Sequence, residues 1–249
     1  MTEFVRASFP VIGTVASIVI ALADEADVRL AHLAIDAARG SLEADDARFS
    51  HYREDSDISR WSAGSSVSPD AVAEIDAVLR QCASLREESE GAFRVNHPTT
   101  GALDTAGYVK GYAIGKAATR MRDLGIRDFV LNVGGDSMNC GRPGADRPWR
   151  VAIAHPILSH GILEIVEAED LAVATSGTAE RGDHIWRVTD DALLSFTVVG
   201  PDIALADSYA TIGFAMGESG FEWVSAHEGY HCIAVRADGS ILCNAALVS

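Results

Sequence analysis

The chain has 249 residues, of which 48% are hydrophobic, so it can bury one large core or two intimately joined lobes. Its formal net charge is −16. A surface this acidic repels nucleic-acid phosphates and anionic lipids, which argues against nucleic acid as a partner and against membrane insertion. An anionic ligand would have to be held by local N–H donors, by a metal ion or by isolated Lys and Arg side chains.

The most apolar N-terminal stretch, residues 11–22, is interrupted by Gly13, Thr14 and Ser17 and is too short to span a membrane. It also lacks the order of basic, apolar and small residues that a signal peptide has. We therefore expect a buried strand here and a cytoplasmic protein. The cysteines are scattered, with no C-x-x-C pair, which indicates buried reduced thiols rather than a disulfide or zinc framework. They are Cys82, Cys140, Cys232 and Cys243.

Hydrophobic periodicity predicts the following elements in chain order. Helices are expected at residues 24–49, 70–85, 107–124 and 205–216. Strands are expected at residues 15–22, 129–133, 151–154, 163–166, 172–175, 185–188, 194–199, 233–236 and 241–247, the last two joined by an Asp-Gly turn. Ser68 or Asp70 should cap the second helix, and Ser56 should cap a short turn in the polar loop before it.

Helices and strands are both abundant but do not alternate one for one, which favours an α+β fold over a doubly wound parallel sheet. We expect mixed or antiparallel sheets with flanking helices. No linker is long enough to divide the chain, so residues 1–249 are interpreted as a single domain, built either as one lobe or as two intimately packed lobes.

Two glycine-containing segments could bind an anionic ligand. In residues 104–112, Asp104 and Lys110 bracket Gly107 at an expected helix start, where free N–H groups attract anions. The spacing is equally typical of an Asp N-cap followed by an exposed lysine. Gly134-Gly135-Asp136 leaves a strand and fits either a tight turn or a loop against a nucleotide.

Two further segments carry polar groups at useful spacings. A buried strand runs into Thr175-Ser176-Gly177, and His184 lies beyond a glycine-rich loop, where it is either structural or catalytic. Asp207 and Thr211 are four residues apart and share a helix face, so they offer two hard oxygen ligands of the kind Mg²⁺ accepts. Alternatively, Asp207 caps the helix and Thr211 bonds back to a carbonyl group.

Eight segments, in this order, resemble motifs of the ApbE family, the FAD:protein FMN transferases. They extend from about residue 10 to residue 216, nearly the whole chain. The resembling segments are Ile12-Gly13-Thr14 (Met-Gly-Thr), residues 49–60 (Ser-x-Tyr-x-x-x-Ser-[Asp/Glu]-[Ile/Leu]), Gly91-Ala92-Phe93 (Gly-Ala-Phe-Asp), residues 104–111 (Asp-x-x-Gly-x-x-Lys-Gly), Gly134-Gly135-Asp136, residues 174–177 (Ala-Thr-Ser-Gly), His184-Ile185 and residues 206–211 (Ala-Asp-Ala-Leu-Ala-Thr).

This resemblance implies an ApbE-like fold and a Mg²⁺-dependent enzyme that moves FMN from FAD to a Thr or Ser hydroxyl of an acceptor flavoprotein and releases AMP. It implies catalytic roles for His184, Lys110 and Asp207. It assigns the metal to Asp207, Thr211 and the carbonyl groups of Gly107 and Ala210. The implied FAD-binding residues are Ile12, Gly13, Thr14, Tyr52, Ala92, Phe93, Asp104, Lys110, Ser176, Gly177 and His184.

Three departures accompany the resemblance. Ile12 replaces Met, and Arg94 stands where the Gly-Ala-Phe-Asp motif has a carboxylate. After His184-Ile185 the chain continues without the family's Asp-Pro-[Arg/Lys]-Thr-Gly loop. The last departure bears on acceptor docking and keeps two alternatives open. These are an FAD pyrophosphatase that gives FMN and AMP, or a flavin-binding protein without turnover. A scaffold protein that retains the motifs only as relics is the third interpretation.

Overall fold

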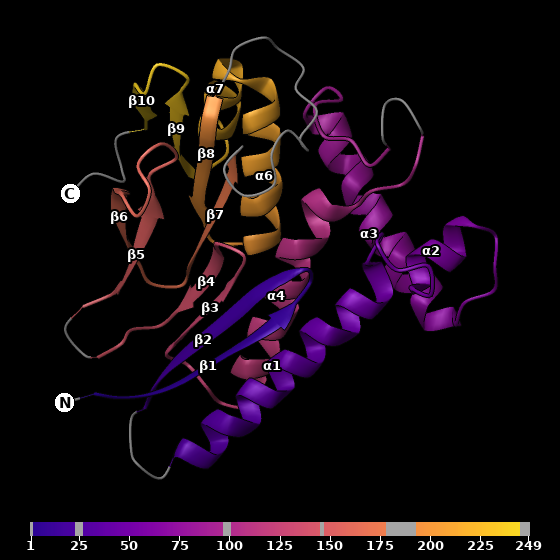
Figure 1. Ribbon diagram of the computed structural model, residues 1–249, viewed down its shortest axis with the longest axis horizontal. Helices are drawn as coiled ribbons and strands as arrows, with labels where there is room; N and C mark the ends of the chain where they lie inside the picture. Colours follow the sequence, from indigo (N-terminus) through magenta and orange to yellow (C-terminus); the bar gives the residue numbers. More distant parts are fainter. Residues whose placement is uncertain (1, 23–26, 97–100, 145–146, 178–192, 245–249) are drawn as a thin grey trace.

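The computed structural model describes residues 2–22, 27–96, 101–144, 147–177 and 193–244. Figure 1 shows strands on one side of the molecule and helices on the other. The strands are β1 (Glu3–Val11), β2 (Thr14–Leu22), β3 (Phe129–Val133), β4 (Asp136–Cys140), β5 (Trp149–Ala154), β6 (Ile162–Ala168), β7 (Leu171–Gly177), β8 (Leu193–Gly200), β9 (His231–Arg236) and β10 (Ile241–Cys243). The helices are α1 (Val28–Phe49), α2 (Asp57–Ser62), α3 (Pro69–Glu88), α4 (Ala106–Asp123), α6 (Ile203–Met216) and α7 (Glu218–Ser225).

Within the described residues, one eight-stranded sheet has the order β1-β2-β3-β4-β7-β8-β9-β10. Each neighbouring pair in it is antiparallel. Strands β5 and β6 form a separate antiparallel pair. The fold is therefore α+β, as predicted, with antiparallel rather than mixed sheets.

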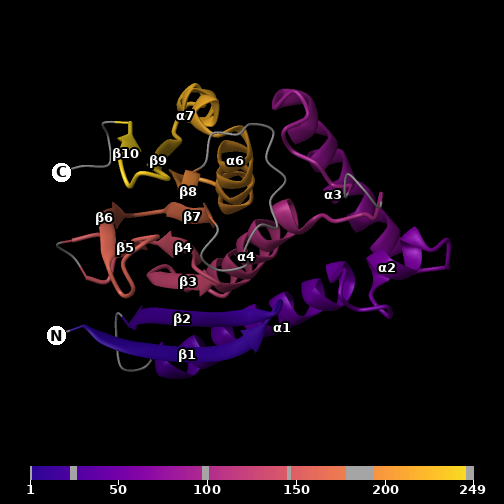
Figure 2. The same ribbon diagram turned by 45° about the horizontal axis from the view of Figure 1, so that its top comes forward.

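The sheet lies between two layers. Helices α1, α4 and α6 run along one face. As Figure 2 shows, α1 lies along β1 and β2, α4 along β3 and β4, and α6 along β7 and β8. On the other face, Ile153 of β5 and Val166 of β6 form an apolar cluster with Val173, Val199 and Ile233 of β7, β8 and β9. Because both faces of β8 are covered, nearly every residue of this strand is buried.

Helices α4 and α6 approach each other closely because of glycine. A Cβ atom on Gly111 would lie 2.6 Å from the carbonyl oxygen of Ile203 and 2.8 Å from Cα of Ala204. No larger residue fits this contact without moving a helix. The contact places the first turns of α4 beside Asp207, and so it positions the site described below.

Most predicted elements are confirmed, with shifts at their ends. Ser68 caps α3 and Ser56 caps α2, each accepting a backbone N–H at 3.2 Å. The strand expected at 241–247 ends at Cys243, and the one at 185–188 lies outside the described residues.

Three elements were not predicted from sequence. Strand β1 is an edge strand with a proline and exposed charged residues, so its apolar alternation is weak. Strand β4 is wholly buried although most of its residues are polar. Helix α7 is a short helix that follows α6 after Gly217. The four cysteines are unpaired, and three of them are buried while Cys243 is half-buried.

Candidate functional site

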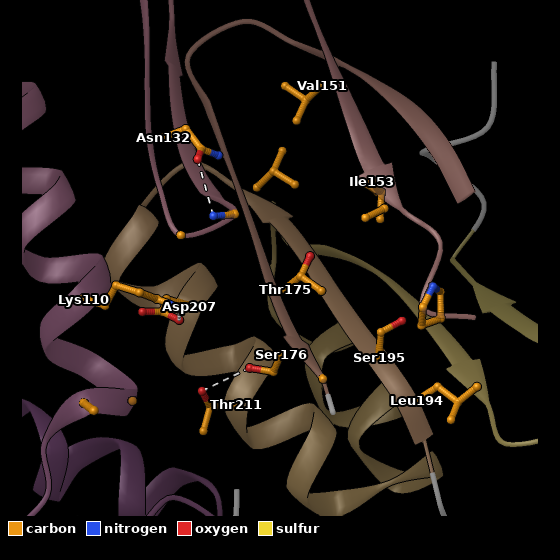
Figure 3. A pocket seen from close by; sticks show the side chains of 18 of the residues that line it. Lys110, Asn132, Val151, Ile153, Thr175, Ser176, Leu194, Ser195, Asp207 and Thr211 are labelled. Atoms are coloured by element: carbon orange, nitrogen blue, oxygen red, sulfur yellow. Dashed lines mark hydrogen bonds and ion pairs between the residues drawn. The ribbon is translucent and has the colours of Figure 1, made fainter. Parts of the chain in front are cut away.

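A cavity of about 350 Å³ lies where α4, α6, the β3–β4 turn and strand β5 meet (Figure 3). This volume falls in the range of small-molecule sites. Lys110 and Asp207 lie on one side in Figure 3, and Val151 and Ile153 lie on the opposite side, with Thr175 between them. One wall is therefore polar and helical, and the other is the apolar face of a hairpin.

The polar wall is built around Lys110. Its Nζ lies 2.5 Å from Oδ2 of Asp136 and 3.4 Å from Oδ1 of Asp207. Both carboxylates are almost fully buried, whereas Lys110 keeps 19% of its side chain exposed. Asp207 also accepts the backbone N–H of Gly111 at 2.9 Å. The sequence placed Lys110 and Asp207 in one site, and the structure brings them together.

The environment of Asp207 disfavours its charged form. Burial raises the pKa of Asp207 to about 7, and Asp136 acts in the same direction. Lys110 and the N–H of Gly111 lower the pKa but do not offset burial. Two buried carboxylates thus share one lysine, and a further cation beside Asp207 would favour its charged form.

Gly134 and Gly135 form the two-residue turn between β3 and β4, with φ of 58° and 93°. Two successive positive φ values are typical of a type I′ hairpin turn, which glycine adopts without strain. The interpretation as a tight turn is thus confirmed, and because both glycines also line the cavity, contact with a nucleotide stays a prediction. The turn places Asp136 at the start of β4, where its Oδ1 accepts the N–H of Thr175 at 2.9 Å.

Hydroxyl groups gather where α4 and α6 cross. Oγ of Ser176 lies 3.3 Å from Oγ1 of Thr211, and Ser208 donates to the carbonyl oxygen of Gly107 at 3.2 Å. A Cβ atom on Gly107 would lie 3.4 Å from the methyl group of Thr211, so these two residues touch. The Asp207 carboxylate, two hydroxyls and a carbonyl group are the hard oxygen donors that Mg²⁺ accepts. The donor chemistry therefore fits the predicted metal.

Side chains occupy two backbone N–H groups at the start of α4. Asp104 accepts the N–H of Ala106 at 2.9 Å, and Nε2 of His51 accepts the N–H of Thr105 at the same distance. Nε2 of His51 also lies 3.0 Å from Oγ1 of Thr105. The interpretation of Asp104 as the N-cap before an exposed lysine is therefore wrong, because Thr105 is the N-cap of α4 and Lys110 keeps only 19% of its side chain exposed. Asp104 lies one residue before the N-cap and lines the cavity.

The alternative in which Asp207 caps its helix is wrong. Helix α6 begins at Ile203, and Asp202 is its N-cap, accepting the N–H of Leu205 at 2.9 Å. Asp207 lies inside the helix, where no cap is needed, and its carboxylate reaches across to α4. Its position is therefore explained by the cavity rather than by helix capping.

The predicted site residues divide into those at the cavity and those away from it. Ile12 and Gly13 form the type I′ turn between β1 and β2, with φ of 52° and 66°, and Thr14 packs on Gly134. A β-branched residue at positive φ is strained, which is common near functional sites. Tyr52 is 94% exposed. The predicted residues in the cavity lining are Ala92, Phe93, Asp104, Gly107, Lys110, Ser176, Gly177, Asp207 and Thr211.

Six predicted site residues are not in that lining, and one of the six lies outside the described residues. Ile12, Gly13, Thr14 and Tyr52 lie outside it, so their contact with flavin stays a prediction. Ala210 is buried in α6 and only its carbonyl group was assigned to the metal. His184 lies outside the described residues.

Sequence reasoning missed part of the cavity. Asp136 was noted only as part of a turn motif, although it is the nearest partner of Lys110. The wall formed by residues 151–156 includes the strand predicted at 151–154, but nothing in Val151 or Ile153 marks a ligand contact. A buried Asp directly after two glycines was the one available signal for Asp136.

The described residues contain no group of three or more His, Cys, Asp or Glu side chains placed to hold a metal ion. A metal at this site would therefore rely on hydroxyl, carbonyl, ligand and water oxygens beside Asp207. Among these same parts of the chain, no helix combines the length and apolar character that crossing a membrane requires.

The fold and cavity define an α+β protein with a cavity of small-molecule size, one wall of which carries Lys110 and two buried carboxylates. Residues 94–234, more than half of the chain, match the model of the ApbE family. The chain therefore belongs to the ApbE family, as the motifs predicted.

Curated relatives and solved structures agree with this assignment. A protein from Rhodobacter capsulatus named FAD:protein FMN transferase is 33% identical over 153 residues, which are 56% of this chain and 29% of that protein. One of the same name from Vibrio cholerae is 29% identical over 130 residues, 47% of this chain and 39% of the relative. The matched segments thus span less than half the length of these relatives.

The solved structure of flavin transferase ApbE from Vibrio cholerae has a TM-score of 0.78 and 22% identity and covers 98% of this chain and 97% of its own. The apo flavinyl transferase ApbE from Pseudomonas stutzeri has a TM-score of 0.79 and 19% identity, with coverages of 98% and 96%. At these identities the likeness shows that the fold is shared.

Proposed function

We propose that this protein is a Mg²⁺-dependent FAD:protein FMN transferase. It moves FMN from FAD to a Thr or Ser hydroxyl of an acceptor flavoprotein and releases AMP. The observation that carries the proposal is the Lys110–Asp136–Asp207 cluster at a cavity wall in a member of the ApbE family. The names of the curated relatives support the same activity.

In this reaction the acceptor oxygen forms a bond to the phosphorus of the FMN half. The bond from that phosphorus to the bridging oxygen breaks, and AMP leaves with this oxygen. The hydroxyl proton must pass to a base, for which His184 is the candidate. A metal ion bound at the site would neutralise charge on the pyrophosphate oxygens.

The residues that would hold Mg²⁺ are Asp207, Thr211 and the carbonyl groups of Gly107 and Ala210. Support comes from the contact of α4 with α6, which brings Gly107 against Thr211 and Lys110 beside Asp207. Lys110 would place its positive charge next to the pyrophosphate. Phe93, which packs on Gly107, and the apolar hairpin wall would exclude water from the reacting atoms.

A second candidate is an FAD pyrophosphatase that uses water in place of the acceptor hydroxyl. It is favoured by the departure after His184, where the motif's Asp-Pro-[Arg/Lys]-Thr-Gly loop is missing from the sequence. That loop bears on acceptor docking more than on FAD or metal binding. The two candidates therefore share one site and differ in what attacks phosphorus.

Incubation with FAD, Mg²⁺ and a flavin-acceptor domain tests the proposal. Mass spectrometry should show an FMN adduct on the acceptor and chromatography an equal amount of AMP. AMP without an adduct would establish hydrolysis instead. FAD that is bound but unchanged would refute both activities. Replacing the acceptor Thr with Val provides the control, because it removes the receiving hydroxyl.

A further inference from the structure

One lysine and one arginine line the cavity, Lys110 and Arg94. Lys110 is engaged with Asp136 and Asp207. Arg94 is exposed, and its Nε donates to the carbonyl oxygen of Gly91 at 3.0 Å. Over the described ranges of the chain it forms no ion pair with a carboxylate. The two terminal nitrogens of its guanidinium group are thus available to a ligand.

The segment that carries Arg94 is fixed to the start of α4. Phe93, directly before it, packs against Gly107, because a Cβ atom there would lie 3.3 Å from the phenyl ring. Directly after it, Val95 accepts the backbone N–H of Asp104 at 2.7 Å. The Nε bond to Gly91 restrains the side chain itself. Arg94 is therefore held at the end of the cavity where α4 begins.

The other charged groups around the cavity do not favour an anionic ligand, so such a ligand would depend on Arg94. Asp104 and Asp207 balance Lys110 and Arg94 in the lining, and Asp136 behind Lys110 adds a further carboxylate. The whole chain has a formal charge of −16, so its surface does not attract an anion. A pyrophosphate carries two negative charges, and Lys110 is already shared between two carboxylates. Arg94 can donate hydrogen bonds to an incoming phosphate group without first breaking an ion pair with a carboxylate of the protein.

We propose that Arg94 binds a non-bridging phosphate oxygen of FAD and so makes this cavity selective for the pyrophosphate over the flavin alone. The inference rests on the proposed function for the identity of the ligand. It assigns Arg94 a role in binding, while Lys110 and Asp207 remain next to the reacting phosphorus.

Binding measurements on single variants test this role. Calorimetry in the presence of Mg²⁺ would compare FAD, riboflavin and inorganic pyrophosphate on the wild type, Arg94→Ala, Arg94→Lys and Arg94→Asp. We expect Arg94→Ala to weaken FAD and pyrophosphate about tenfold and riboflavin by less than twofold. Arg94→Lys should bind FAD and pyrophosphate more tightly than Arg94→Ala, because it keeps the positive charge but not the forked guanidinium group. Arg94→Asp should bind them more weakly than Arg94→Ala.

Arg86→Ala is the matched control, because Arg86 is an exposed arginine of α3 that does not line the cavity. It removes the same charge and should leave all three affinities unchanged. Arg94 is also exposed, so thermal unfolding of its variants should stay close to that of the wild type.

The outcomes separate the inference from the proposed function. Equal weakening of FAD and riboflavin in Arg94→Ala would place the arginine on the flavin and overturn the inference. So would unchanged FAD affinity with a higher KM for the acceptor protein. A wild type that binds FAD with an affinity that depends on Arg94, but releases no AMP and labels no acceptor, would keep the inference and refute the proposed function. A wild type that binds neither FAD nor pyrophosphate would refute both.

Discussion

Replacing Gly111 with Ala should damage the site through the backbone. The added Cβ atom would lie 2.6 Å from the carbonyl oxygen of Ile203, 2.8 Å from Cα of Ala204 and 3.0 Å from Cβ of Asp207. The first two contacts are with the backbone of α6, so the helices must separate to relieve them. Asp207 then loses the N–H of Gly111, which it accepts at 2.9 Å.

The expected magnitude follows from three contributions. Overpacking of this kind costs about 1–3 kcal/mol, and loss of a hydrogen bond to a charged group costs about 1.5–3 kcal/mol. Ala gains about 1 kcal/mol over Gly in helix propensity. The net loss is about 1.5–5 kcal/mol, which lowers the Tm by roughly 3–20 °C for a chain of this size.

Gly40→Ala is the matched control, because Gly40 lies in α1 and a Cβ atom there would meet nothing within 4 Å. This variant should gain about 0.5–1 kcal/mol from helix propensity alone. Thermal unfolding and FAD titration of both variants check the argument. The reasoning is refuted if Gly111→Ala is as stable as the wild type and binds FAD with unchanged affinity.

Three further predictions concern residues around the cavity. Asp136→Asn should lower the free energy of unfolding by about 1–3 kcal/mol in urea, because Lys110 loses its nearest partner; a change below about 0.5 kcal/mol would contradict this. Burial lowers the pKa of His51, although Asp104 at 3.9 Å opposes this, so the unfolded chain takes up the proton first as pH falls. The contribution of neutral His51 to the free energy of unfolding is present above about pH 6.5 and is lost as the pH falls through its lowered pKa. His51→Gln should flatten this part of the plot of unfolding free energy against pH, and a plot identical to that of the wild type would refute the assignment. Tyr52→Ala should change stability by less than about 0.5 kcal/mol, because Tyr52 is 94% exposed, and a weaker affinity for FAD would confirm its predicted flavin contact.

Elements could be predicted from sequence where the signal is local. The apolar residues of α1 and α3 recur at the spacing of one buried helix face, and an Asp-Gly pair marks the turn before β10. Strand β4 was not predicted because Asp136 and Asn139 are buried with hydrogen-bond partners from a distant segment, the N–H of Thr175 and the carbonyl oxygen of Leu171. No local sequence pattern indicates that the backbone N–H of Thr175, 39 residues away, donates to the carboxylate of Asp136.

The part of the site that could be predicted from the sequence is the part formed by residues of the motifs. Lys110, Asp207 and Thr211 were placed together from their motifs, and all three line the cavity. The hairpin wall was not predicted, because Val151 and Ile153 are ordinary strand residues whose role comes only from where β5 packs. Spacing alone also left Asp207 ambiguous until the helix start at Ile203 showed that another Asp caps it.

The most direct test of the account is Mg²⁺-dependent release of AMP from FAD by the wild type and by Asp207→Ala. In the presence of an acceptor domain, the wild type should release AMP, and addition of a chelator should stop the release. Asp207→Ala should release none while retaining a near-native circular dichroism spectrum and a cooperative unfolding transition. Full AMP release by a folded Asp207→Ala variant would contradict the assignment of this cavity as the place where the pyrophosphate is cleaved.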